Sequence, residues 1–340
     1  MPSHDPAWVQ DMHAEHYLQS WSTQGNRPIV IAGGEGSWFW DTDGNRYLDF
    51  QSQLVNLSLG HQHPAIVEAI KAQADKLCYI GPSMGSDVRS ELAALMHDIT
   101  PGNLTSTFFT TGGAAANETA VRLARHYTGR HKIIARYRSY HGATMGALAV
   151  TGDYRRPPLE PTVPGAMRIL DCYCDRCPFG KEIDTCAREC ATQLDEVLGL
   201  EGGVGAAIFE PVPGANGVLV PPADYWPRLR QACDRHGALL IADEVLTGFG
   251  RTGTALGIDH WEVCPDLITV AKGLTAGYVP MGAVLVHERV AAHFDDSVLY
   301  AGLTGYGHPL GIAAAREALA VYRDEGLYAR AASMEQELRR

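Results

Sequence analysis

The sequence predicts an α/β fold in which a large three-layer domain with a mostly parallel sheet carries a smaller α+β unit. With 340 residues, the chain exceeds the usual size of a single core. Short apolar runs alternate with helical patterns along most of the sequence, and these runs are nearly continuous, as in strands buried on both faces. We therefore expect helices to cover both faces of the sheet.

Six short apolar runs are the predicted strands of the large domain: 106–110, 131–137, 206–210, 238–243, 266–271 and 282–286. Helical spacing of apolar residues predicts helices in four other segments: 64–77, 87–98, 114–128 and 223–236. Each helix can return the chain across a face of the sheet, so this alternation is what indicates parallel strands.

The two ends of the chain differ from this pattern. The stretch GSWFWDTDGNRYLDF, residues 36–50, places a D-G turn between aromatic-rich segments, which predicts a β-hairpin. We assign residues 1–56 to the N-terminal segment of the small domain and 57–310 to the large domain. Residues 311–340 are an amphipathic helical stretch with a break near Gly326, and we assign them to a connecting helix.

Composition and charge narrow the class of protein. Hydrophobic residues make up 46% and charged residues 20%, as in a globular enzyme. The formal net charge of −11 argues against a nucleic-acid partner, because phosphate-backbone binding needs clustered Lys and Arg. The N-terminus lacks a basic flank and an apolar core, and no later run is long enough to span a bilayer. We expect a cytoplasmic protein without a membrane partner.

The eight cysteines are unevenly distributed, because five of them fall between residues 172 and 190: Cys172, Cys174, Cys177, Cys186 and Cys190. Thiolates two residues apart can share a metal in a tight turn, and the pair at helical spacing could complete a tetrahedral structural zinc site. An insertion loop with free thiols is the other interpretation, and the spacing is not that of a standard zinc finger. We assign no metal ligands.

A lysine in an unusual place gives the first indication of chemistry. The chain has five lysines, and Lys272 directly follows the apolar run 266–271. A lysine at a buried strand end loses hydration, which lowers its pKa and makes the neutral amine available to attack an aldehyde. A lone lysine in this position more often extends its ammonium to solvent, so Lys272 needs support from other residues.

Three further features provide that support. Asp243 ends the run ALLIAD at the carboxyl edge of a predicted strand, where open α/β sheets bind ligands. Gly112 and Gly113 stand between a strand and a helix, and free N–H groups at such a helix start can hold a phosphate. Tyr140 follows another strand and could stack on a flat ring. Taken singly, each has an ordinary structural explanation: a capping carboxylate, a tight turn and a packed aromatic.

In order along the chain, these motifs resemble the class III, pyridoxal-phosphate-dependent aminotransferases of fold type I. The resemblance is carried by YLDFQSQLVNLSLGHQHPAIVEAI, YRSYHGAT, EPVPGANGV, DEVLTGFGRTG, TVAKGLTAGYVPMGAV and LTGYGHPLG, which together cover nearly the whole chain. It implies a homodimeric enzyme that acts on small-molecule amines and keto acids.

The resemblance also implies residue roles. Lys272 would form the Schiff base with the cofactor and carry the proton, and Asp243 would pair with the pyridine nitrogen. The other cofactor-binding residues that it implies are Gly112 and Gly113 for the phosphate, Tyr140 and Val245 on the two ring faces, Glu210 in support of Asp243, His141 beside the ring, and Thr304 reaching the phosphate in the neighbouring subunit.

Within the class, the sequence looks most like the taurine:pyruvate and ω-amino acid:pyruvate aminotransferases. Ala215 stands where glutamate-using members often carry a glutamate, which favours pyruvate or glyoxylate rather than 2-oxoglutarate as acceptor. The remaining small-domain part of the family, with its carboxylate-binding arginine, would follow Arg340, so we expect the sequence to lack it. Two alternatives stay open: another pyridoxal-phosphate reaction such as an aminomutase or racemase, and a catalytically silent, truncated relative with a structural zinc site.

Overall fold

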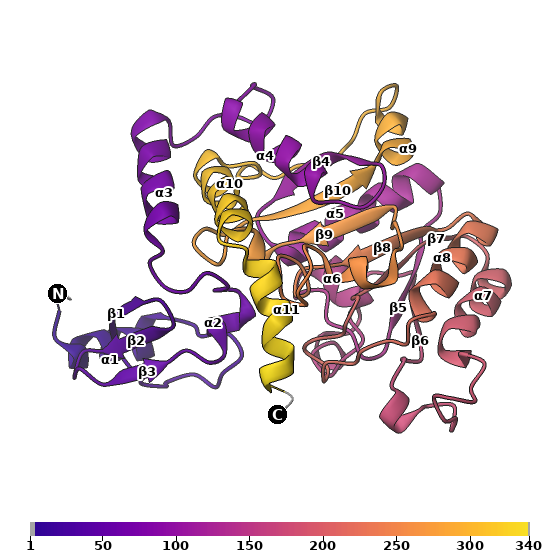
Figure 1. Ribbon diagram of the computed structural model, residues 1–340, viewed down its shortest axis with the longest axis horizontal. Helices are drawn as coiled ribbons and strands as arrows, with labels where there is room; N and C mark the ends of the chain where they lie inside the picture. The colour runs from indigo at the N-terminus through magenta and orange to yellow at the C-terminus, as the bar shows by residue number, and fades with distance from the viewer. Residues whose placement is uncertain (1–3, 339–340) are drawn as a thin grey trace.

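The computed structural model describes residues 4–338. Its centre is a seven-stranded sheet with the strand order β4-β10-β9-β8-β7-β5-β6, drawn in Figure 1. The strands are β4 (Leu104–Thr110), β5 (Lys132–Arg136), β6 (Ala166–Ile169), β7 (Val204–Phe209), β8 (Leu239–Asp243), β9 (Leu267–Val270) and β10 (Gly282–His287). Only β10 runs antiparallel to its neighbours, β4 and β9, so the predicted mostly parallel sheet is confirmed.

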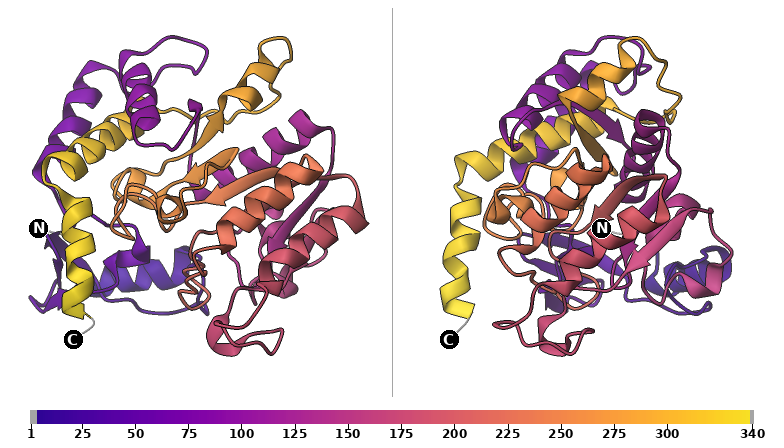
Figure 2. Two further views of the ribbon diagram at one scale, coloured as in Figure 1. Left: turned by 45° about the vertical axis from the view of Figure 1, so that its right-hand side comes forward. Right: turned by 90° about the vertical axis from the view of Figure 1, so that its right-hand side faces the viewer.

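The helices that cover the sheet lie in two layers. On one face, α5 (Gly113–Thr128) packs across the central strands and α6 (Met145–Val150) packs at β5 and β6. The other face carries α4 (Asp87–Asp98), α7 (Glu189–Glu201), α8 (Tyr225–His236) and α10 (Pro309–Asp324), with α3 (Pro64–Lys76) packed on α10. Figure 2 shows these layers from two further directions.

Alternation along the strands explains the continuous apolar runs. In β8, Leu239 and Ile241 pack with α5 in one core cluster, whereas Leu240 and Ala242 belong to the other. Each strand residue points to the face opposite its neighbour's, so a sheet covered on both sides needs apolar side chains at every position. The sequence therefore predicted six of the seven strands. The four-residue strand β6 at the sheet edge was missed because only its last residue, Ile169, is buried and the charged Arg168 interrupts its apolar residues.

The N-terminal part forms a separate three-stranded antiparallel sheet, made of β1 (Ile31–Glu35), β2 (Trp38–Asp41) and β3 (Arg46–Leu48). The predicted hairpin is β2-β3, and Asp41 accepts the backbone N–H groups of Asp43 and Asn45 in its turn. The helix α1 (Pro6–His16) precedes this sheet, and the short α2 (Ser52–Val55) follows it. The division of the chain into domains at residues 56 and 310 stays a prediction.

The C-terminal helical stretch is broken where the sequence predicts. Between α10 and α11 (Leu327–Leu338), Gly326 adopts a φ of 62°, a left-handed conformation that ends a helix readily in glycine. Helix α11 lies beside the three-stranded sheet and is largely exposed (Figures 1 and 2). Between residues 4 and 338, no helix combines the length and the apolar character needed to cross a membrane.

The packing predicts a large difference between two apolar truncations. Ile208 in β7 is fully buried in the core, whereas Leu200 on α7 is 79% exposed. We expect Ile208→Ala to lower the free energy of unfolding by about 2–5 kcal/mol, because it removes buried methyl groups and leaves a cavity. Leu200→Ala is the control, with an expected change of about 0.5 kcal/mol or less. Urea denaturation measures both, and equal losses would contradict the proposed core.

Candidate active site

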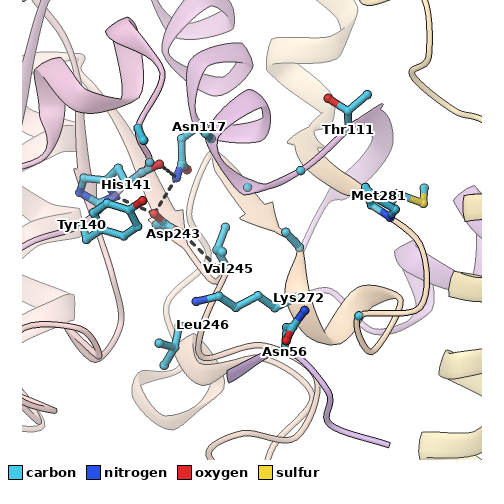
Figure 3. A pocket seen from close by; sticks show the side chains of 18 of the residues that line it. Asn56, Thr111, Asn117, Tyr140, His141, Asp243, Val245, Leu246, Lys272 and Met281 are labelled. Carbon is cyan, nitrogen blue, oxygen red and sulfur yellow. Dashed lines mark hydrogen bonds and ion pairs between the residues drawn. The ribbon is translucent and has the colours of Figure 1, made fainter. Parts of the chain in front are cut away.

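A cavity of about 500 Å³ opens at the carboxyl ends of the parallel strands. Three strand ends supply its chemistry: β4 leads to Gly112, β8 ends in Asp243, and β9 leads to Lys272. Parallel strands place their carboxyl ends on one edge of the sheet, and ligands bind in open α/β sheets at that edge. In Figure 3, the Lys272 side chain extends across the cavity toward the side where Asp243 and Tyr140 lie.

The Asp243 carboxylate is 2% exposed and is held by three donors. Its Oδ2 atom lies 2.6 Å from His141 Nδ1 and accepts a hydrogen bond of 2.8 Å from Asn117 Nδ2. Its Oδ1 atom accepts the backbone N–H of Val245 at 3.0 Å. Charge-assisted hydrogen bonds of this kind are what permit a carboxylate to be buried, so its position in the cavity wall is fixed.

Asn117 is a site residue that the sequence reasoning missed. It lies one helical turn into α5 and is 1% exposed. Besides its bond to Asp243, Nδ2 donates to the backbone oxygen of His141 at 2.7 Å, and Oδ1 accepts from the Thr269 hydroxyl at 2.6 Å. The available signal was a polar residue at position i+4 of the α5 start, on the helix face that is otherwise small and apolar.

His141 completes this buried group of side chains. Its backbone N–H donates to the Thr151 hydroxyl at 2.9 Å, which fixes the chain beside the ring. Its Nδ1 atom faces Asp243, while Nε2 is buried and has no protein partner among the described residues. His141 is 2% exposed, so its bond to Asp243 is shielded from competition by water.

Glu210 follows β7 and is also buried, but its hydrogen bonds run to the backbone rather than to Asp243. Its carboxylate accepts the N–H of Tyr140 at 3.0 Å and that of Gly214 at 3.2 Å. Burial raises the pKa of Glu210; the charge of His141 acts against this rise, and that of Asp243 adds to it. Glu210 thus joins the segment after β5 to the segment after β7 and fixes the backbone that carries Tyr140.

Lys272 has the perturbed pKa that its place in the sequence predicts. Burial lowers the pKa of its ammonium, and the charges of Asp243 and Glu210 act against this shift without cancelling it. Arg251 and Arg155 lower the pKa further through their positive charges. Desolvation by burial is the dominant cause, because removing water penalises the charged form of an amine.

Close packing shapes the floor of the cavity at the start of α5. Gly112 precedes the helix and carries no side-chain cap, so N–H groups of the first turn have no side-chain acceptor there. A Cβ atom added at Gly113 would lie 2.9 Å from Val245 Cγ1. Gly113 is therefore required for close approach, and Val245 lies directly against the helix start.

Tyr140 lines the cavity and is part of a group of two aromatic rings and one arginine. The Arg155 guanidinium lies over the Tyr140 ring, 4.4 Å from its centroid, and 5.4 Å from the centroid of Trp21. Trp21 meets Tyr140 edge-on at 6.4 Å between centroids. Arg155 also pairs with the buried carboxylate of Asp153. Neither Arg155 nor Trp21 was identified from sequence, because both come from segments without a recognisable pattern.

The predicted site residues do not all meet in this one cavity. Lys272, Asp243, Glu210, Tyr140, His141, Val245, Gly112 and Gly113 line it together. Thr304 lies outside, in an exposed loop where its backbone oxygen accepts the Tyr79 hydroxyl at 2.8 Å. Asn56 and Met281 also line the cavity and were not predicted; Asn56 comes from the segment after α2 (Figure 3).

The cysteine-rich segment lies away from the cavity. Its five thiols are free and surround a small space of about 20 Å³, which they share with Arg188. Burial raises the pKa of Cys190 to about 12, and the neighbouring thiols add to this rise. Within the part of the chain that the structure describes, no group of three or more His, Cys, Asp or Glu side chains is arranged to hold a metal ion.

Comparison with known proteins matches this fold and site to an enzyme family. The Aminotransferase class-III family model matches residues 20–340. A solved taurine:2-oxoglutarate aminotransferase from Bifidobacterium kashiwanohense, in complex with PLP and glutamate, superposes with a TM-score of 0.96 and 41% identity, covering 100% of this chain and 78% of the other. An (S)-enantioselective omega-transaminase from Thermomicrobium roseum gives a TM-score of 0.94 and 36% identity, covering 99% and 79%.

The curated relatives agree on the reaction class while they differ in substrate. An acetylornithine aminotransferase from Methanopyrus kandleri is 38% identical over 90% of this chain and 73% of its own length. A putrescine--pyruvate aminotransferase from Pseudomonas aeruginosa is 34% identical over 87% of this chain and 68% of its own length. The chain belongs to the class-III aminotransferase family, the pyridoxal-phosphate-dependent enzymes of fold type I that exchange amino groups between small amines and keto acids.

Proposed function

We propose that this protein transfers an amino group from an ω-amino acid, such as taurine or β-alanine, to pyruvate. The observation that carries the proposal is the pairing, in one cavity, of a buried lysine whose pKa is lowered with a fixed carboxylate. Lys272 supplies a nucleophilic amine, and Asp243 supplies a negative charge. A pyridoxal phosphate enzyme needs both groups on the same face of its fold.

The cavity fits pyridoxal phosphate in its size and in its donor set. Its volume of about 500 Å³ lies within the usual range for cofactor sites. Asp243 would accept from the pyridine nitrogen, and the uncapped N-terminus of α5 at Gly112 and Gly113 would hold the phosphate. Tyr140 and Val245 would contact the ring, and Lys272 would bind its aldehyde. When bound, the cofactor supplies an electron sink for the bond broken beside the amine nitrogen.

The residues around the ring have distinct tasks in this proposal. With the cofactor bound, the neutral Lys272 amine would be the base that accepts the proton from the carbon bearing the donor's amino group, and the resulting ammonium would be the acid that gives this proton back to the bound molecule. Its lowered pKa keeps a larger fraction of the amine neutral at physiological pH, which general-base catalysis requires. The donors on Asp243 fix that carboxylate in the cavity wall, and Glu210 holds the Tyr140 backbone in place.

Arg155 is the feature that favours an acidic donor. Its guanidinium lies over the ring of Tyr140, which lines the cavity, and its positive charge contributes to the lowered pKa of Lys272. A planar guanidinium with several donors suits the oxygens of a carboxylate or sulfonate. Asp153 orients it from a buried position. An ω-amino acid would thus place its acid group at Arg155 and its amine at the Lys272 side of the cavity.

The acceptor is the less constrained half of the proposal. Ala215 lines the cavity and offers no carboxylate to pair with a mobile arginine, which favours pyruvate, the acceptor without a second carboxylate. 2-Oxoglutarate is the second candidate, because the structural relative with 41% identity is named a taurine:2-oxoglutarate aminotransferase. A cation such as Arg155 would bind the distal carboxylate of that acceptor as readily as it binds an acidic donor.

We also propose that the active form is a homodimer with shared active sites. Thr304 lies in an exposed loop outside its own chain's cavity, and the nearby Tyr300 is 77% exposed. Exposed aromatic residues in such loops are typical of surfaces that a partner covers. In the dimer, Thr304 would reach the phosphate bound by the neighbouring subunit.

Lys272→Ala tests the central assignment. We expect it to remove the absorbance band of the lysine–cofactor link, leaving only that of the unlinked aldehyde, and to reduce transamination by about 10³-fold or more, because both the covalent link and the base are lost. Borohydride reduction of the wild type followed by peptide mapping should label Lys272. Lys181, an exposed lysine, provides the control as Lys181→Ala; label on a lysine other than Lys272 would overturn the assignment.

The lowered pKa of Lys272 predicts a pH-dependent stability. Its ordinary pKa is 10.5 and the folded value is lower, so the unfolded state binds more protons in between. Stability of the cofactor-free protein should therefore rise with pH through that window. Lys272→Met removes the buried charge, so it should unfold at a higher temperature than the wild type at pH 7, with an advantage that shrinks toward pH 10.5. A constant advantage across this range would contradict the lowered pKa.

Arg155→Gln tests the donor class. We expect kcat/KM for taurine or β-alanine to fall by about tenfold to a hundredfold, since a charge-assisted hydrogen bond is lost. An amine donor without a carboxylate or sulfonate should react as before. Arg155→Lys keeps the positive charge but loses the planar guanidinium, so its kcat/KM for these donors should lie between that of the wild type and that of Arg155→Gln. Assays with pyruvate and with 2-oxoglutarate decide the acceptor. Interconversion of one substrate without use of a keto acid would indicate an aminomutase or racemase instead.

A further inference from the structure

The turn that carries Lys272 has a strained backbone. Lys272 opens a single 3-10 turn, Lys272–Leu274, directly after β9, and its φ is 35°. A positive φ costs a residue with a side chain about 1–2 kcal/mol, and such a conformation persists only where the surroundings determine it strongly. A set of contacts must therefore hold this turn, and those contacts also determine where the Lys272 amine lies.

One of these contacts comes from the far end of the sequence. The Tyr322 hydroxyl, on α10, donates to the backbone oxygen of Gly273 at 2.8 Å. The same oxygen accepts the Ala276 N–H at 3.2 Å, so both of its lone pairs are used. Tyr322 is 2% exposed, which removes competition from water. The bond fixes the peptide unit immediately after Lys272.

The Tyr322 ring is itself held in place on both sides. Phe249 stacks on it with 6.2 Å between ring centroids, and Tyr328 stacks with 5.7 Å. Phe249 also limits the turn, because a Cβ atom added at Gly273 would lie 2.9 Å from Phe249 Cβ. Only glycine allows the turn to come this close to Phe249, so ring and turn form one packed unit.

A polar chain continues from Tyr322 to another part of the cavity wall. Burial raises the pKa of Tyr322, and a hydrogen bond with the Ser58 side chain acts against this rise. Arg251 donates to Ser58 Oγ at 3.3 Å and to the backbone oxygen of Val55 at 3.2 Å. The next residue, Asn56, lines the cavity. Tyr322 is thus linked to two segments of the cavity wall: the turn that carries Lys272 and, through Ser58 and Arg251, the segment that carries Asn56.

We propose that Tyr322 is a positioning residue that holds the Lys272 turn, so that the amine enters the cavity in the geometry needed for proton transfer. Tyr322 touches neither the substrate nor the cofactor region and acts through the Gly273 backbone oxygen. The inference deepens the proposed function, on which the role of Lys272 as base rests. Misplacing a reacting group by a fraction of an ångström lowers a rate without weakening substrate binding.

Tyr322→Phe in the cofactor-loaded protein removes only the hydroxyl and tests this inference. We expect kcat to fall by about tenfold with little change in KM, and the primary isotope effect with a donor deuterated at the reacting carbon to increase. A second readout does not depend on turnover: the pH midpoint of the visible absorbance, which reports the link between Lys272 and the cofactor. We expect this midpoint to rise by about half a unit or more, because a Lys272 turn released from the Tyr322 bond can adjust to stabilise the protonated form of that link.

Tyr328→Phe is the matched control, because Tyr328 stacks on the same ring but its hydroxyl does not reach Gly273; it should leave the midpoint and the isotope effect unchanged. A wild-type midpoint and isotope effect in Tyr322→Phe would overturn the proposal. If that variant fails to fold, Ser58→Ala replaces it and should shift the midpoint in the same direction by less; no shift overturns the proposal. Absence of ω-amine turnover in the wild type would instead contradict the proposed function, and the absorbance titration would still decide the role of Tyr322.

Discussion

The rest of the site depends on one constraint: a carboxylate, Asp243, is buried at the end of a central strand and must be satisfied by hydrogen-bond donors. Its two oxygens are fully engaged by His141, Asn117 and a backbone N–H. Each of these donors is fixed by a further contact, so the position of the charge is set before any ligand binds. Such preorganised charge is effective because it needs no rearrangement when the ligand arrives.

The same buried environment creates the opposite requirement at Lys272. Burial removes water from both groups. At Asp243, hydrogen-bond donors compensate for the lost water, whereas at the Lys272 amine the compensation is incomplete, and the pKa of the lysine is lowered. A strained backbone, with φ of 35°, brings the amine to the cavity. Both features cost stability, and both are typical of functional sites, where the surrounding fold supports conformations and charges that would otherwise be avoided. The packed unit of Gly273, Phe249 and Tyr322 is part of that support.

In the proposed function, substrate selection would be separated in space from the bond-breaking chemistry. Asp243 and Lys272, which would serve the cofactor, lie at strand ends, whereas the Arg155 guanidinium lies near the rings of Tyr140 and Trp21. Loops and terminal segments can change without disturbing the sheet, and this separation agrees with a family whose relatives act on different amines. The cysteine-rich segment is likewise peripheral, because it lies outside this cavity.

The sequence by itself determined the fold class and the chemical pair. Near-continuous apolar runs predicted six of seven strands because both sheet faces are covered, and the order of motifs around Lys272 and Asp243 indicated the family. The tertiary structure alone decided which residues complete the site. Arg155 and Tyr322 come from segments without a motif, and Asn117 lies within a predicted helix whose pattern does not show what it contacts; helices and loops distant in sequence bring these residues to their partners. A local sequence pattern shows how often buried residues recur along a strand or helix, but it does not show which side chains from distant segments will contact one another after folding.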